Sequence, residues 1–154
     1  AVYEHLLPAE RRSLLPRLWN ALQPGGVLFV NQTPHRYSPI EMHTTRLPLI
    51  NYLPDSLAHR IARRYARAEI GRTWEAMLRA GIRGATSGEI VGLLGPHARL
   101  MEPRQGDLID LWYGKLSQRH AAFKKALRAT LKAIKPLGGS HLVPELTLAI
   151  RKSA

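Results

Sequence analysis

Residues 22–30 read Leu-Gln-Pro-Gly-Gly-Val-Leu-Phe-Val, and this stretch decides the expected fold. The triplet at 24–26 predicts a tight turn, because proline fixes φ and glycine reaches conformations that other residues avoid. Residues 27–30 form a short apolar run, the pattern of a strand buried on both faces of a parallel sheet. Residues 8–23 carry leucines at helical spacing. A helix, a turn and a buried strand in this order predict one step of an α/β fold.

The chain on the C-terminal side of this strand predicts a long loop followed by further helices and strands. Residues 31–54 contain four prolines among polar residues, which is typical of a functional loop or lid. Asp55 is expected to cap a helix that ends near residue 67 and buries Leu57, Ile61 and Tyr65. Shorter helices are expected near 73–81 and 87–95, and a long one over 116–134. Residues 98–101 and 145–151 have strand patterns.

Composition bounds the class of protein. A chain of 154 residues with 45% hydrophobic side chains is expected to form a single domain. It has no cysteine, which excludes disulfide scaffolds, thiolate zinc sites and a cysteine nucleophile. No apolar run approaches the roughly 20 residues of a membrane-spanning helix, so we expect no membrane span. These features favour a cytoplasmic location.

The charge is strongly basic, with 23 Lys and Arg against 11 Asp and Glu and a net charge of +12. Such an excess is typical of proteins with a polyanionic partner, and nucleic acid is the first candidate. Two predicted helix faces could follow a phosphate backbone, at residues 60–67 and 124–135. The alternative is a solvated, arginine-rich surface with no partner, and both interpretations stay open.

Two segments together resemble the middle of class I S-adenosylmethionine-dependent methyltransferases. The chain opens with Val-Tyr-Glu-His-Leu at 2–6, and a helix then leads through Leu-Gln-Pro-Gly-Gly into the apolar run. In that family a strand ends in a hydrophobic-Glu-His-Leu sequence, and a Leu-x-Pro-Gly-Gly turn precedes the next buried strand. Residues 33–36 and 47–54 also look like the substrate-side insertion of some members, and 144–152 is similar to the last strand.

The resemblance implies a partial Rossmann-like sheet with flanking helices and a loop and helical insertion over 31–95. No Gly-x-Gly-x-Gly motif occurs in the sequence, and the family's acidic ribose ligand has no counterpart. The chain is therefore expected to be the C-terminal half of the catalytic domain, holding strands four to seven at most. It begins without methionine, as a fragment would. Its expected partner is the N-terminal half of the same protein.

The implied activity is methyl transfer from the cofactor S-adenosylmethionine to an undetermined small-molecule acceptor. Ligands of open α/β sheets bind beyond the carboxyl ends of the strands. The resemblance places Glu4 and His5 there, as contacts of the cofactor or the acceptor. His5 could take a proton from the acceptor, since its usual pKa lies near neutrality. The alternative is that both residues cap the following helix.

The polar residues of the long loop are expected to bind the acceptor in a pocket under a lid: Asn31, Thr33, His35, Tyr37, Glu41 and His43. The alternative is ordinary turn chemistry with exposed histidines. A metal site at Glu41 and His43 is disfavoured, because a flexible loop lacks a helical pair of histidines, and no metal is expected. The rival function is a non-catalytic, basic nucleic-acid-binding module, and a third possibility is a scaffold that keeps only the fold.

Overall fold

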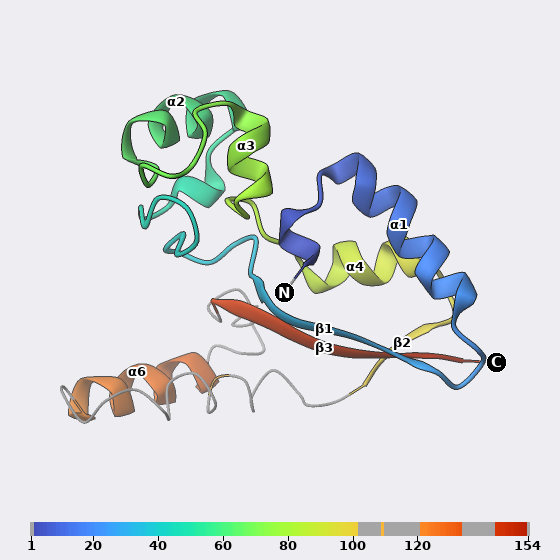
Figure 1. The fold of residues 1–154 in the computed structure, drawn as a ribbon. Coiled ribbons are helices and arrows are strands. Elements are labelled where there is room, and N and C mark those ends of the chain that lie inside the picture. The colour runs from blue at the N-terminus through green and yellow to red at the C-terminus, as the bar shows by residue number, and fades with distance from the viewer. Residues whose placement is uncertain (1, 102–108, 110–120, 134–143, 154) are drawn as a thin grey trace.

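The computed structural model describes residues 2–101, 109, 121–133 and 144–153 (Figure 1). Its fold is mixed α/β, with a three-stranded sheet in the order β1-β3-β2. The strands are β1 (Val27–Pro34), β2 (Ala98–Met101) and β3 (Glu145–Lys152). The last strand lies in the centre and runs antiparallel to both neighbours, so β1 and β2 point the same way. The carboxyl end of β1 therefore meets the start of β3.

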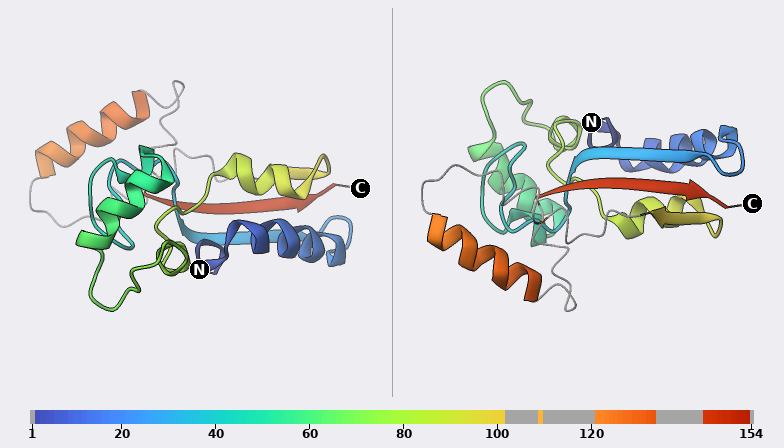
Figure 2. Two further views of the ribbon diagram at one scale, coloured as in Figure 1. Left: turned by 90° about the horizontal axis from the view of Figure 1, so that it is seen from above. Right: turned by 90° about the horizontal axis from the view of Figure 1, so that it is seen from below.

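The helices fall into groups that the two views of Figure 2 separate. Helices α1 (Pro8–Ala21) and α4 (Ser87–Leu94) cover one face of the sheet. Three elements gather at the carboxyl end of β1, namely η2 (Ile50–Tyr52), α2 (Asp55–Tyr65) and α3 (Trp74–Arg79). The 3-10 turn η1 (Tyr3–His5) lies between the two groups, and α6 (Ala121–Ala133) lies below the sheet in Figure 1.

Two hydrophobic clusters hold these groups. The first joins the covered face of the sheet to α1 and α4, with Trp19 3% exposed and Ile150 fully buried. The second lies within the η2–α2–α3 group, around Ile50, Met77 and Ile82. Burying each large apolar side chain contributes about 1.5–3 kcal/mol, so each cluster stabilises the group of elements that it joins.

The prediction of a strand buried on both faces of a parallel sheet is wrong for residues 27–30. The strand pairs with β3 in antiparallel register, and Phe29 is 73% exposed. Helices cover a single face of the sheet in the described part of the chain, and side chains alternate between faces along a strand. Phe29 therefore points to the open face, while Leu28 and Val30 pack into the first cluster.

Several local predictions are confirmed. Both expected strands form, and α3 begins after Thr73, whose hydroxyl accepts the N–H of Ala76. The prediction for α2 is confirmed for Ile61, which packs against the second cluster, and is wrong in two respects: Asp55 lies inside the first turn, and the buried residues are Ala58 and Ala62. Small side chains let this helix approach the second cluster closely, which leaves the larger Leu57 and Tyr65 outside. The expected helix over 116–134 lies partly outside the described residues.

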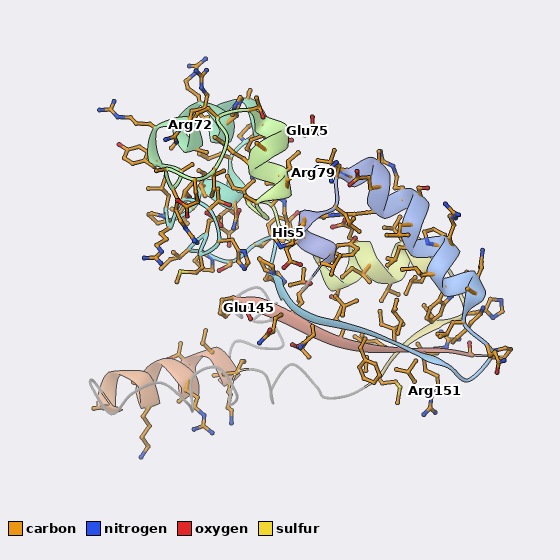
Figure 3. The ribbon with its side chains drawn as sticks, in the orientation of Figure 1. His5, Arg72, Glu75, Arg79, Glu145 and Arg151 are labelled. Carbon is orange, nitrogen blue, oxygen red and sulfur yellow. The ribbon has the colours of Figure 1, made fainter. Side chains whose placement is uncertain are left out.

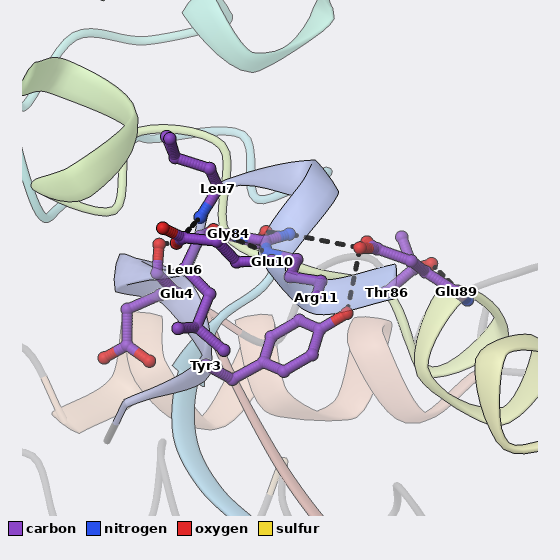
Figure 4. A network of polar contacts seen from close by, with 9 residues as sticks. All are labelled: Tyr3, Glu4, Leu6, Leu7, Glu10, Arg11, Gly84, Thr86 and Glu89. Atoms are coloured by element: carbon purple, nitrogen blue, oxygen red, sulfur yellow. Dashed lines mark hydrogen bonds and ion pairs between the residues drawn. The ribbon is translucent and has the colours of Figure 1, made fainter. Parts of the chain in front are cut away.

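A buried arginine joins η1, α1 and α4 (Figure 4). The Arg11 guanidinium donates to the Gly84 carbonyl at 2.7 Å and to Glu89 Oε1 at 3.1 Å. It also lies 4.6 Å from the centre of the Tyr3 ring, a cation–π contact. The Tyr3 hydroxyl donates to the same Glu89 oxygen at 2.9 Å, and burial together with the Glu89 charge raises the pKa of Tyr3 well above its usual value.

Glu10 links α1 to α3 and makes stability depend on pH. Its carboxylate accepts two hydrogen bonds from Arg79, at 2.7 and 2.8 Å, and one from the Leu7 N–H at 2.8 Å. The Arg79 hydrogen bonds, followed by the Leu7 one, lower the pKa of Glu10. A lowered pKa in the folded state stabilises the fold above the usual carboxyl range, and this stability is lost as the pH falls through the lowered pKa.

We therefore expect Glu10→Gln to flatten the acid side of the stability profile. Urea unfolding of the wild type and the variant, followed across the carboxyl range, measures this difference. The two proteins should converge at the acid end, where Glu10 is protonated. A constant gap at every pH would contradict the assignment.

Candidate functional site

A cavity of about 520 Å³ opens at the carboxyl end of β1, where the η2–α2–α3 group meets the start of β3. The volume is within the range of small-molecule sites. The cavity is lined by residues of the β1 end, the following loop, α6 and the β3 start: Pro34, His35, Ser38, Pro39, Ile40, Glu41, Met42, His43, Asn51, Ile82, Gly84, Leu131, Pro144 and Glu145.

The loop after β1 is held in place by its own backbone. Ile40 and Pro48 form an antiparallel bridge, and the Leu49 N–H donates to the Pro39 carbonyl at 2.7 Å. The Glu41 carboxylate closes the turn between them, accepting the N–H groups of residues 43, 44 and 45 and the Thr45 hydroxyl. Four donors use both carboxylate oxygens, so Glu41 shapes the loop and is not available to a ligand.

The wall of the cavity is mainly apolar. Ile82 and Leu131 are 2% and 4% exposed and form its inner part, while Ile40 and Met42 are about half exposed at its mouth. Gly84 lies in the lining with φ of +51°. This apolar wall suits a ligand that buries apolar surface against the protein. The wall would also exclude water from the polar end of such a ligand.

Asn51 offers an unused acceptor in this cavity. Its side-chain NH2 donates to the Ser38 carbonyl at 3.3 Å, and a carbonyl can only accept, which settles the amide orientation. The other amide atom, Oδ1, is buried without a hydrogen-bond partner among the described residues, and Asn51 as a whole is 4% exposed. Buried polar atoms are normally paired, so Oδ1 is suited to a donor from a ligand.

Glu145 adds a carboxylate at the start of β3. Burial raises its pKa above the usual value, and the nearby negative charge of Glu4 raises it further. Both causes destabilise the ionised form of Glu145, because its carboxylate has lost water and faces another carboxylate. A cation or a hydrogen-bond donor placed beside Glu145 would stabilise that ionised form.

Glu4 and His5 lie beside the cavity and outside its lining. Figure 3 shows His5 and Arg79 at the same end of the sheet as Glu145. The His5 Nδ1 donates to the Arg79 carbonyl at 2.6 Å, and its Nε2 is 3.6 Å from Glu4 Oε1. Glu4 is 2% exposed, and its Oε2 has no partner in the described chain. Gly81 separates Glu4 from His43, since a Cβ there would lie 3.3–3.4 Å from both side chains.

The alternative role of Glu4 and His5 as helix caps is wrong. Helix α1 begins after Leu7, whose backbone N–H is satisfied by Glu10. The two residues form a 3-10 turn where the resemblance implies a strand end.

The six loop residues expected to bind the acceptor divide evenly. His35, Glu41 and His43 line the cavity, whereas Asn31, Thr33 and Tyr37 do not. The Asn31 Oδ1 accepts the Thr147 hydroxyl on the sheet, Thr33 is fully buried, and the Tyr37 ring packs 6.0 Å from that of Tyr52. Asn31 and Thr33 lie on β1 on either side of Gln32, where the register with β3 shifts, and neither is among the residues that line the cavity.

Sequence reasoning missed Ser38, Asn51 and Glu145 as members of the site. Asn51 carried a usable signal, because it is a polar residue in an otherwise apolar stretch between Pro48 and Pro54. Glu145 carried none. It reaches the cavity only because β3 pairs with β1, with Glu145 opposite Pro34, across more than a hundred residues of chain.

Two further surfaces bear on partners. Arg60, Arg63 and Arg64 line a separate hollow of about 450 Å³ on α2 together with Ser56 and His59. An apolar groove of about 300 Å³ lies between α1 and β1, bordered by the exposed Val2, Leu18 and Phe29. Within the described ranges, no three His, Asp or Glu side chains are placed to hold a metal ion, and no helix is long and apolar enough to cross a membrane.

Comparison of the chain with family models, with curated proteins and with solved structures gives no match.

Proposed function

We propose that this chain is the acceptor-binding part of a class I S-adenosylmethionine-dependent methyltransferase. The observation that carries the proposal is the cavity at the carboxyl end of β1, bordered by the Glu4–His5 turn. The family resemblance implies that cofactor and acceptor meet at this edge. Three of the loop residues expected to bind the acceptor line that cavity.

The strand order supports the same proposal. The last strand of the chain lies between the two earlier ones and is antiparallel to both. The family resemblance assigns residues 144–152 to the last strand of a Rossmann-like methyltransferase sheet, and these residues form β3. The described residues would then supply the last three strands of such a sheet.

The open edge of β1 supports a separate N-terminal half. In the described chain β1 pairs with β3 alone, so its other edge has unpaired backbone groups. The apolar groove beside that edge exposes Val2 by 70% and Phe29 by 73%. A further strand and the helix that follows it would cover both features.

The residues present fit only the reactive end of the cofactor. The glycine-rich loop that would hold most of S-adenosylmethionine is absent from the sequence, whereas the buried Oε2 of Glu4, which has no partner in the described chain, is suited to a positively charged group. When bound, the cofactor supplies an electrophilic methyl group on a cationic sulfur. Glu4 would neutralise that charge, and the cavity would orient the acceptor in line with the methyl group and exclude water.

His5 is arranged to handle a proton. Its Nδ1 must carry hydrogen to donate to the Arg79 carbonyl, which leaves Nε2 facing the Glu4 carboxylate. Nε2 is therefore the ring nitrogen with a free lone pair, the one that can accept a proton. We propose that His5 Nε2 receives the proton that the acceptor loses.

Calorimetric titration with S-adenosylhomocysteine tests the proposal. Residues 1–154 alone should show no measurable binding, and a protein extended by the N-terminal half should bind. In the extended protein, Glu4→Gln should weaken binding of S-adenosylmethionine about tenfold, because its sulfur carries the positive charge that Glu4 would neutralise, and should leave S-adenosylhomocysteine binding nearly unchanged; Glu75→Gln, on the exposed side of α3, should change neither. Tight binding by residues 1–154 would contradict the half-domain arrangement, and no binding by the extended protein would contradict methyl transfer.

The basic hollow on α2 favours one alternative, a non-catalytic nucleic-acid-binding module. Three arginines and a histidine lie together there, and the net charge of the chain is +12. Binding to DNA or RNA that falls steeply with salt, in an extended protein without cofactor affinity, would favour this alternative.

A further inference from the structure

We propose that the cavity at the end of β1 selects a mainly apolar acceptor whose buried end is an amine or a hydroxyl, and excludes acceptors with a phosphate or carboxylate there. The term acceptor rests on the proposed function. The ligand preference rests on the cavity alone, and it can be measured without the cofactor.

The charge of the cavity lining disfavours an anionic ligand. The chain has 23 lysines and arginines, yet none is among the described residues that line the cavity. The nearby Arg83 is committed elsewhere, because its guanidinium donates to the carbonyls of residues 50, 51 and 53 and to Asp55. Recognition of a phosphate or carboxylate normally requires arginine, lysine or a helix N-terminus. The described part of this lining offers an anionic ligand no lysine or arginine side chain.

The hydrogen-bonding groups of the cavity lining favour a ligand that donates. Asn51 presents a buried oxygen without a donor, and Glu145 presents a carboxylate. The His35 Nδ1 accepts the Tyr37 N–H at 3.1 Å, and Glu41 has used its oxygens on the loop backbone. The acceptors left for a ligand are therefore Asn51 Oδ1 and the Glu145 carboxylate, and both favour a ligand that donates.

The burial of Glu145 favours a cation or a hydrogen-bond donor beside its carboxyl group. Burial and the Glu4 charge raise the pKa of Glu145, and no lysine or arginine of the described chain is among the causes that lower it. An ammonium group beside Glu145 would supply a cation, and a hydroxyl would supply a hydrogen bond. A carboxylate would add a further negative charge beside Glu145 and Glu4. The apolar wall, with Ile82 and Leu131 inside, binds the remainder of the molecule.

Three probes that share a phenyl group and a short chain test the preference: phenethylamine, phenethyl alcohol and phenylacetate. Each is titrated into residues 1–154, and NMR signals of Ile82 and His43 show whether it enters the cavity. The amine should bind about tenfold more tightly than phenylacetate, with the alcohol between them. Equal affinity, tighter binding of phenylacetate, or no binding of any probe would overturn the inference.

Two variants locate the cause. Glu145→Gln should weaken phenethylamine binding about fivefold and leave the alcohol unchanged, because only the amine uses the negative charge. Met42→Arg places a cation at the half-exposed mouth and should reverse the order in favour of phenylacetate. The exposed Glu75→Gln serves as the matched control for loss of one negative charge. Failure of these results would leave S-adenosylhomocysteine binding by the extended protein as an independent test of the proposed function.

Discussion

The Gly84→Ala substitution is expected to lower the free energy of unfolding by about 3 kcal/mol or more. Gly84 has φ of +51°, a conformation that alanine adopts only with strain. An added Cβ would lie 2.1 Å from the Pro34 carbonyl oxygen and 2.7 Å from its carbon. That backbone cannot move easily, because the same oxygen accepts the Ala85 N–H at 2.9 Å and Pro34 ends β1.

Gly92→Ala is the matched control. Gly92 lies in the interior of α4, and nothing approaches within 4 Å of the position that its Cβ would occupy. Alanine favours a helix interior over glycine by about 0.5–1 kcal/mol, so this variant should be slightly more stable than the wild type. Urea unfolding of the three proteins measures both effects. Equal stability of Gly84→Ala and wild type would show that β1 and residues 81–85 are not packed as described.

The Gly84 result also bears on the cavity, because Pro34 and Gly84 both line it. A shift of either backbone segment would change the position of His35, which follows β1 and bridges to Ala85. If Gly84→Ala remains folded, we expect weaker binding of phenethylamine as well. The stability of this turn and the shape of the candidate site therefore depend on the same contact.

The Arg11→Leu substitution is expected to cost about 3 kcal/mol of stability. Leucine would leave the carbonyls of Leu6 and Gly84 without the donors that Arg11 provides at 3.0 and 2.7 Å. Glu89 would keep only the Tyr3 hydroxyl as a partner of its Oε1 from this network. Part of the ion-pair energy is screened, since the Glu89 side chain is 36% exposed, and the unpaired buried carbonyls account for most of the cost.

Arg12→Leu provides the control at the next position of α1. Arg12 is exposed, so its replacement removes the same charge without opening a buried network, and stability should change by less than about 0.5 kcal/mol. Thermal or urea unfolding compares the two variants with the wild type. Similar losses for both would mean that net charge, and not the Tyr3–Arg11–Glu89 network, controls stability.

Local signals in the sequence were sufficient for most of the individual elements. The Pro-Gly-Gly turn does precede a strand, and Gly25 adopts the positive φ of +82° that such a turn requires. Thr73 caps the helix that it was expected to cap, and the alternating pattern near the C-terminus forms β3. These features depend on backbone conformation, hydrogen bonds within a few residues and side-chain periodicity, all of which are written in a short stretch of chain.

Burial and register were decided by tertiary structure. Residues 27–30 are equally apolar on both sides, so the pattern could not show that one face would stay uncovered and leave Phe29 exposed. The buried face of α2 was predicted on its large residues, yet Ala58 and Ala62 pack inside because close approach needs small side chains.

The residues of the candidate site likewise follow partly from local sequence and partly from tertiary contacts. The loop after β1 identified His35, Glu41 and His43 from the sequence alone, because prolines and polar residues concentrate there. Glu145 joins them only through the pairing of β3 with β1, and Asn51 only through the packing of η2 against the loop. Contacts between distant segments depend on which surfaces cover one another, and a linear pattern does not contain that information.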